Sequence, residues 1–285
     1  MGGWRTLVSA EDLSQALGDP GLVVVDCRFS LADTDGGEAA WRQAHIPGAV
    51  YAHLDRDLSD HRRHGKGQGR HPWPEAADFT ARLGAWGIGR DSQVVAYDAG
   101  DGGLAAARLW FLLRALRHER VAVLDGGFAR WTALGLPVDA TVPQPRATEY
   151  RGEFDRSLLL DPAEVQRRLD GGALLLDARA PARFRGDVEP LDKAAGHVPG
   201  ARNRPYADNL DDGRFKSAET LASEYRALLD GRDPSQAIAM CGSGVTACHL
   251  LLAMEHAGLR GAKLFTGSWS GWVEDPQRPV ATGDG

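Results

Sequence analysis

The two halves of the chain repeat one another, and this repeat constrains the fold more than any other feature of the sequence. Three short motifs of the first half recur in the same order in the second half: 9–13 as 161–165, 22–28 as 174–179, and 45–49 as 197–201. The offsets are 152, 151 and 152 residues for the pairs Ser9/Asp161, Asp26/Asp177 and His45/His197. Ordered matches at nearly one offset indicate a duplicated structural unit.

The repeated motifs predict the same order of strands and helices in each half. The runs 22–26 and 174–177 are apolar and end in Asp, which is typical of buried parallel strands. Ser9 and Asp161 each precede a helical segment and have an acid three positions later, as helix N-caps do. We therefore predict an α/β protein with two tandem domains, each a parallel sheet flanked by helices.

A segment without hydrophobic periodicity separates the two repeats. It contains Pro143, Pro145 and Gly152 and predicts a linker over 141–156, between a first domain over 1–140 and a second over 157–285. The stretch 55–74, rich in Asp, His, Arg, Gly and Pro, predicts a long surface loop of the first domain.

Length and charge narrow the class of protein. The 285 residues are 43% hydrophobic and suit two domains with real cores. A net charge of −6 argues against a nucleic-acid partner, and no run reaches the ~20 apolar residues that cross a bilayer. The N-terminus lacks an apolar signal core, so we expect a cytoplasmic protein without membrane contact.

Three cysteines, Cys27, Cys241 and Cys248, form no CxxC pair, so the sequence suggests neither a disulfide framework nor a zinc site. Cys241 is the candidate nucleophile because it ends an apolar strand and opens a glycine-containing loop before the helical run 245–256. Backbone N–H groups of such a loop and the helix N-terminus favour a thiolate or a persulfide anion, and Ser243 and Thr246 add hydroxyl groups.

Two other interpretations of Cys241 are open from the residues alone. It is either a small buried apolar residue beside a turn, or the nucleophile of a phosphatase-like loop. Phosphate chemistry requires an Arg that closes the loop on the oxyanion, and this loop closes with Ala247. The repeat places Asp98 or a near neighbour at the equivalent position of the first domain, so only the second domain carries a thiol there.

Taken together, these motifs resemble the two-domain rhodanese family of sulfurtransferases over nearly the whole chain. The resemblance rests on 45–49, on 197–201, and on 265–272, which departs from the family pattern at Thr266 and Gly271. The loop 241–247, Cys-Gly-Ser-Gly-Val-Thr-Ala, is similar to that of the 3-mercaptopyruvate branch, whereas thiosulfate-using members often place basic residues after the cysteine.

The resemblance implies roles for further residues. Asp177 would support the active loop. Arg183 would bind an anionic donor, with Arg185 as a weaker candidate. His45 would either join Ser243 and an Asp such as Asp35 in a relay or only tie down its turn. The remaining substrate-binding candidates lie in the loop: Gly242, Gly244, Val245 and Thr246.

One departure concerns the sulfur donor. Leu191 stands where the 3-mercaptopyruvate branch has a second donor-binding Arg after a Glu-Pro pair, and Lys193 is the nearest alternative cation. The resemblance implies sulfur transfer from a small anionic donor, with 3-mercaptopyruvate favoured, to a thiol or cyanide through a Cys241 persulfide, without metal or organic cofactor. The alternatives are a thiosulfate:cyanide sulfurtransferase and a non-catalytic persulfide carrier or regulatory module. A thioredoxin-like reductant is a further expected partner.

Overall fold

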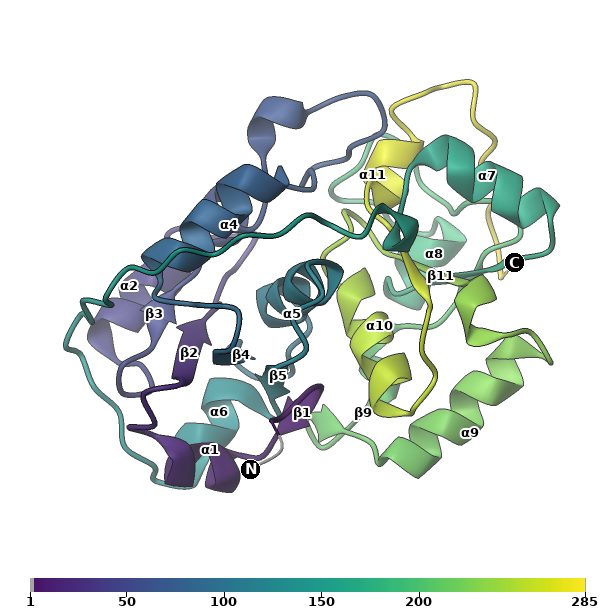
Figure 1. Cartoon of the computed structure of the whole chain (residues 1–285). Helices are drawn as coiled ribbons and strands as arrows, with labels where there is room; N and C mark the ends of the chain where they lie inside the picture. The colour runs from purple at the N-terminus through teal and green to yellow at the C-terminus, as the bar shows by residue number, and fades with distance from the viewer. Residues whose placement is uncertain (1–2, 285) are drawn as a thin grey trace. The chain divides into compact units, whose positions relative to one another are not determined.

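The chain forms two compact units in the computed structural model, which describes residues 3–284 (Figure 1). The first unit contains residues 3–59, 74–155 and 212–215, and the second contains 60–73, 156–211 and 216–284. Each unit is described separately below.

The first unit alternates strands and helices along the chain. Its elements are β1 (Leu7–Val8), α1 (Ala10–Ala16), β2 (Leu22–Asp26), α2 (Gly36–Gln43), β3 (Val50–Tyr51), α3 (Leu54–Asp57), α4 (Ala76–Ala85), β4 (Gln93–Tyr97), α5 (Ala105–Ala115), β5 (Val121–Leu124), α6 (Gly127–Ala133) and β10 (Arg214–Phe215).

The second unit repeats this alternation with additional single turns of 3₁₀ helix. Its elements are η1 (His61–Arg63), η2 (Arg156–Leu158), β6 (Leu159–Leu160), α7 (Pro162–Asp170), β7 (Leu174–Asp177), α8 (Pro181–Arg185), β8 (Arg202–Asn203), η3 (Tyr206–Asn209), β9 (Leu210–Asp211), α9 (Ala218–Leu229), η4 (Pro234–Gln236), β11 (Ala237–Met240), α10 (Ala247–His256), β12 (Lys263–Phe265) and α11 (Ser268–Trp272).

Both units contain a five-stranded parallel sheet with the same strand order. The order is β1-β5-β4-β2-β3 in the first unit and β6-β12-β11-β7-β8 in the second. β4 therefore corresponds to β11, and β2 to β7. The predicted duplication and the predicted α/β class are confirmed.

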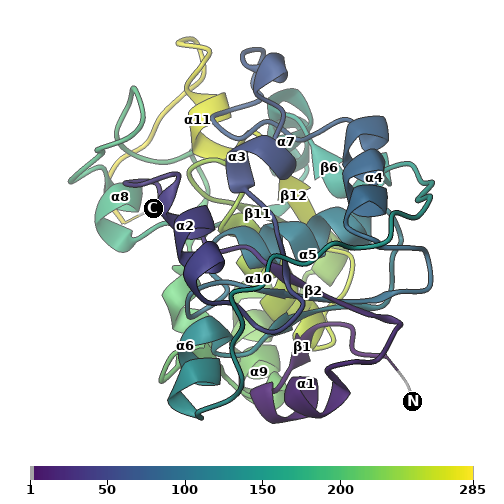
Figure 2. The same ribbon diagram turned by 90° about the vertical axis from the view of Figure 1, so that its left-hand side faces the viewer.

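Helices cover both faces of each sheet because the buried strands are apolar on both sides. In the first unit, Val95 and Tyr97 of β4 belong to one core with Trp131 of α6, on the face where α1 contacts α6 (Figure 2). On the other face, α5 packs against β4 and β5 (Figure 1). The second unit has an equivalent core, which contains Trp269 and Trp272 of α11.

The predicted helix starts are confirmed. The side chain of Ser9 accepts a hydrogen bond from the N–H of Asp12, and that of Asp161 accepts one from Glu164, with Pro162 as the first residue of α7. Within residues 3–284, no helix combines the length and apolar composition needed to span a membrane.

The structure revises two expectations about the irregular segments. The stretch expected as a linker packs on the first unit up to Asp155, where Tyr150 and Phe154 are buried. Residues 60–73, expected in a surface loop of the first domain, belong to the second unit. The N–H groups of Gly67 and Gly69 donate to the Glu274 carboxylate at 2.6 and 3.0 Å, and these bonds attach the segment there.

Candidate active site

Cys241 directly follows β11 and is almost fully buried, with 3% of its surface exposed. Its backbone N–H donates to Ser268 Oγ at 3.1 Å, and its carbonyl accepts from the N–H of Trp269 at 3.0 Å. The first residues of α11 therefore hold both the N–H and the carbonyl of the candidate nucleophile. Cys241 lies at the carboxyl edge of the sheet, where sites form in parallel α/β folds.

The loop after Cys241 turns sharply into α10. Gly244 has φ +79°, a left-handed conformation that favours glycine, and the carbonyl of Gly242 accepts from Ser270 N–H at 2.8 Å. Among residues 3–284, no hydrogen bond is found for the backbone N–H groups of Ser243, Val245 and Thr246. Such donors at a helix N-terminus carry partial positive charge and are suited to an anionic sulfur.

Ser243 is paired with a histidine, but not with the predicted one. Its Oγ lies 2.7 Å from Nδ1 of His71, and both side chains are buried. Of the two roles left open for His45, the relay with Ser243 is not found among the described residues, and the contacts of His45 fit the other role, which ties down its turn. His45 Nδ1 lies 2.7 Å from the carbonyl of Trp41, and its ring stacks on the Trp41 indole in the first unit. Asp35 precedes α2 as its N-cap residue.

Arg183 lies beside the nucleophile loop and is held by two buried carboxylates. Its Nη2 donates to Glu189 Oε1 at 2.7 Å and to Asp192 Oδ2 at 3.2 Å. Burial alone would raise the pKa of Glu189, but the Arg183 guanidinium and the backbone N–H of Leu191 outweigh it and hold that pKa below its usual value. A β-carbon added to Gly242 would lie 3.4 Å from Arg183 Nη1, which places the guanidinium next to the residue after Cys241.

Asp177 supports this region through Arg179, which sequence reasoning did not single out. Arg179 Nε and Nη2 donate to the Asp177 carboxylate at 3.0 and 2.7 Å, and both side chains are buried. The Arg179 guanidinium also lies over the Trp269 ring, 4.8 Å from its centroid. Because the Trp269 N–H holds the Cys241 carbonyl, this ion pair connects the end of β7 to the nucleophile.

Other predicted residues lie away from these contacts. Arg185 pairs with Asp187 and has a side chain that is 38% exposed. Leu191 is exposed, and only its backbone N–H takes part, as a donor to Glu189. Lys193 is exposed. Cys248 is buried, and its thiol lies 3.4 Å from the Gly244 carbonyl.

Arg70 and His71 are the site residues that sequence reasoning missed, because the stretch containing them looked like a surface loop. Their segment curls tightly, because four residues within five positions have a left-handed backbone: Gly65, Lys66, Gly67 and Gly69. The alternating glycines before Arg70 and His71 are the signal that could have indicated an ordered loop.

The first unit carries Asp98 at the position of Cys241. The carbonyls of Asp98 and Ala99 accept from Phe128 and Ala129, just as those of Cys241 and Gly242 accept from Trp269 and Ser270. Asp98 Oδ2 accepts from the N–H groups of Leu104 and Ala106, while Oδ1 is buried without a partner among the described residues. Burial raises the pKa of Asp98 to about 7.

This carboxyl predicts an unusual pH dependence of stability. Between its ordinary pKa and about 7, Asp98 is protonated in the folded chain and ionised in the unfolded chain, so rising pH favours unfolding. Relative to Asp98→Asn, the wild-type free energy of unfolding should fall by on the order of 1 kcal/mol per pH unit through this window. Urea unfolding of both proteins at pH 5 and pH 8 measures the difference. Parallel pH profiles would contradict it.

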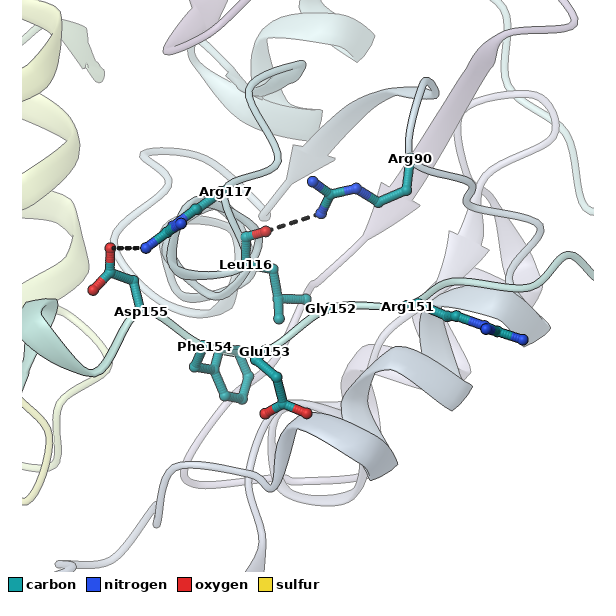
Figure 3. Close-up of a pocket in the computed structure, with 8 residues that line it drawn as sticks. All are labelled: Arg90, Leu116, Arg117, Arg151, Gly152, Glu153, Phe154 and Asp155. Atoms are coloured by element: carbon teal, nitrogen blue, oxygen red, sulfur yellow. Dashed lines mark hydrogen bonds and ion pairs between the residues drawn. The ribbon is translucent and has the colours of Figure 1, made fainter.

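A separate pocket of about 390 Å³ lies in the first unit (Figure 3). Its arginines make structural contacts: Arg90 donates to the Leu116 carbonyl, and Arg117 pairs with Asp155. None of the predicted site residues lines this pocket. It lies where residues 151–155 pack on the first unit, and we give it a structural role.

Comparison with known proteins gives concordant matches. The model of the rhodanese-like domain matches residues 9–134 and 161–275. The chain is 49% identical over 281 residues to a Pseudomonas aeruginosa protein named "Probable 3-mercaptopyruvate sulfurtransferase", covering 98% of both chains. It is 33% identical to a Cricetulus griseus thiosulfate sulfurtransferase, covering 98% of this chain and 96% of that one.

A solved structure of a 3-mercaptopyruvate sulfurtransferase from Leishmania major aligns with a TM-score of 0.80 at 30% identity. The alignment covers 93% of this chain and 73% of the Leishmania chain. These matches span both units and agree with the duplicated sheet.

Proposed function

This chain belongs to the rhodanese family of sulfurtransferases, and from that premise we propose that it transfers sulfur from 3-mercaptopyruvate through a persulfide on Cys241. The observation that carries the proposal is the environment of Cys241. A buried cysteine follows a strand, the backbone N–H groups of Ser243, Val245 and Thr246 have no partner within residues 3–284, and the Arg183 guanidinium lies beside Gly242.

In the first step, the Cys241 thiolate attacks the thiol sulfur of the donor. A sulfur–sulfur bond forms and the carbon–sulfur bond breaks, so that the carbon fragment leaves as the enolate of pyruvate and takes up a proton. Arg183 holds the donor carboxylate, and the Ser243–His71 pair is placed to move the proton. Loop N–H groups stabilise the persulfide anion.

In the second step, an acceptor attacks the outer sulfur and Cys241 leaves as the thiolate. A thiol acceptor becomes a persulfide, and cyanide becomes thiocyanate. We propose small thiols, cyanide and a thioredoxin-like reductant as acceptors. This two-step transfer is nucleophilic catalysis through a covalent intermediate, and the residues named here perform it without a cofactor.

Thiosulfate is the second candidate donor. Attack on its outer sulfur would release sulfite and form the same persulfide. It is favoured by one observation, the similarity to a relative named as a thiosulfate sulfurtransferase.

Intact-protein mass analysis tests the proposal. After incubation with 3-mercaptopyruvate and no acceptor, the protein should gain the mass of one sulfur atom, and peptide mapping should assign it to Cys241. Thiosulfate in a parallel sample should produce less of this species. A gain assigned to Cys27 or Cys248, or no gain with either donor, contradicts the proposal. A larger gain with thiosulfate would make thiosulfate, and not 3-mercaptopyruvate, the preferred donor. A persulfide that forms but is passed only to a protein acceptor would indicate a carrier.

A further inference from the structure

We propose that two buried carboxylates, those of Glu189 and Asp192, set the charge of the donor site and select a donor with one negative charge over a donor with two. This inference rests on the function proposed above and deepens it, because it names residues that make 3-mercaptopyruvate a better donor than thiosulfate. The two carboxylates act through the guanidinium groups that they bind and do not themselves touch the donor.

The first observation is that cations and carboxylates are balanced beside the nucleophile loop. A β-carbon added to Gly242 would lie 3.1 Å from Arg70 Nη2 and 3.4 Å from Arg183 Nη1. Asp192 binds the guanidinium groups of both arginines. Glu189 binds that of Arg183. The formal charges of these four side chains, two positive and two negative, therefore sum to zero at the edge of the loop.

The second observation is that the hydrogen bonds of both carboxylates are those of ionised groups. Glu189 Oε1 accepts from Arg183 Nη2 at 2.7 Å and from the N–H groups of Leu191 and Asp192 at 3.0 and 3.1 Å. Asp192 accepts from Arg70 through Oδ1 and from Arg183 through Oδ2. A proton on any of these oxygens would face a hydrogen-bond donor, so each side chain contributes a full negative charge.

The third observation is that both carboxylates are shielded from solvent. The side chains of Glu189 and Asp192 are each only 3% exposed. Water and dissolved salt screen exposed charges strongly and buried charges much less. The two carboxylates therefore act on an anion bound at the loop more strongly than an exposed carboxylate of the same segment would.

The charge of the donor decides which molecule such a site favours. 3-Mercaptopyruvate carries one negative charge while its thiol is protonated, whereas thiosulfate carries two. Taking a dianion out of water costs more than taking a monoanion out, and a site without net charge does not offset the second charge. Two unit charges about 10 Å apart, at an effective dielectric constant of about 20, change an equilibrium constant roughly tenfold. Removing one carboxylate should favour the dianion by about that factor.

The ratio of two specificity constants tests this inference, with cyanide as the acceptor for both donors. In Asp192→Asn protein, kcat/KM for thiosulfate divided by kcat/KM for 3-mercaptopyruvate should rise roughly tenfold above the wild-type ratio. Glu189→Gln should raise the ratio as well, although its amide oxygen can still accept from the backbone N–H groups of 191 and 192. A disturbed structure would lower both constants together and leave their ratio unchanged, so the ratio reports the charge.

Asp187→Asn is the matched control, since it removes a carboxylate of the same segment whose side chain is 52% exposed. Its ratio should stay within about twofold of the wild-type ratio, because solvent screens an exposed charge. Ratios of the Asp192→Asn and Glu189→Gln proteins that match the control, or an equal rise in all three proteins, would overturn the inference. Failure of the proposed function is seen elsewhere, as a wild-type protein that forms no persulfide with either donor.

Discussion

Cys241→Ser is expected to lower kcat/KM for sulfur transfer by roughly 10⁴-fold or more, the scale on which enzymes lose activity without their nucleophile. A serine hydroxyl cannot form the sulfur–sulfur bond on which both steps depend. The loop should remain folded, because the backbone of residue 241, not its side chain, bonds Ser268 and Trp269. Initial rates of pyruvate release and of thiocyanate formation measure the loss.

Cys248→Ser is the matched control for this prediction. Its hydroxyl can still donate to the Gly244 carbonyl, as the thiol does at 3.4 Å, so folding and most activity should be retained. If Cys248→Ser abolished transfer and Cys241→Ser did not, the nucleophile would be Cys248 and the loop would have another role.

The fold could be predicted from the sequence because the repeat is local and ordered. Asp26 and Asp177 end equivalent strands, and the two sheets have the same strand order. The position of Cys241 after a strand followed from the same alignment. Apolar runs and helix caps are formed by residues that are close together in the sequence, so a single sequence is enough to recognise them.

The missed residues depend on contacts distant in sequence. His71 meets Ser243 across 172 positions, and Gly67 meets Glu274 across 207. No local pattern encodes such a pairing, and the glycines that allow the curl also resemble those of a mobile loop. For His45 the resemblance left two roles open, a relay with Ser243 or the anchoring of its turn, and in the structure its imidazole packs on Trp41.

The role of Asp177 stays a prediction. The resemblance implied that it supports the active loop, and the structure gives a physical route for such support through Arg179 and Trp269. The route requires knowledge of which side chain lies over the indole, and sequence spacing does not provide it.

Arg179→Met is expected to destabilise the chain by about 3–5 kcal/mol, because it leaves the buried Asp177 carboxylate without its charged partner. The same replacement removes the donor to the Gly196 carbonyl, which now accepts from Arg179 Nη2 at 2.7 Å. Urea unfolding followed by tryptophan fluorescence measures the loss. Arg167→Met, which breaks an exposed pair with Glu164, should cost about 1 kcal/mol or less.

A second variant separates the ion pair from simple packing. Asp177→Asn combined with Arg179→Met removes the uncompensated charge and should recover part of the lost stability. If the double variant is no more stable than Arg179→Met, the cost lies in the lost contacts with Trp269 and the Gly196 carbonyl and not in the buried charge. With either outcome, both variants should lose sulfurtransferase activity, because the loss of Arg179 leaves Trp269 of α11 less firmly held. The Trp269 N–H fixes the carbonyl of Cys241 and thereby the position of the attacking sulfur.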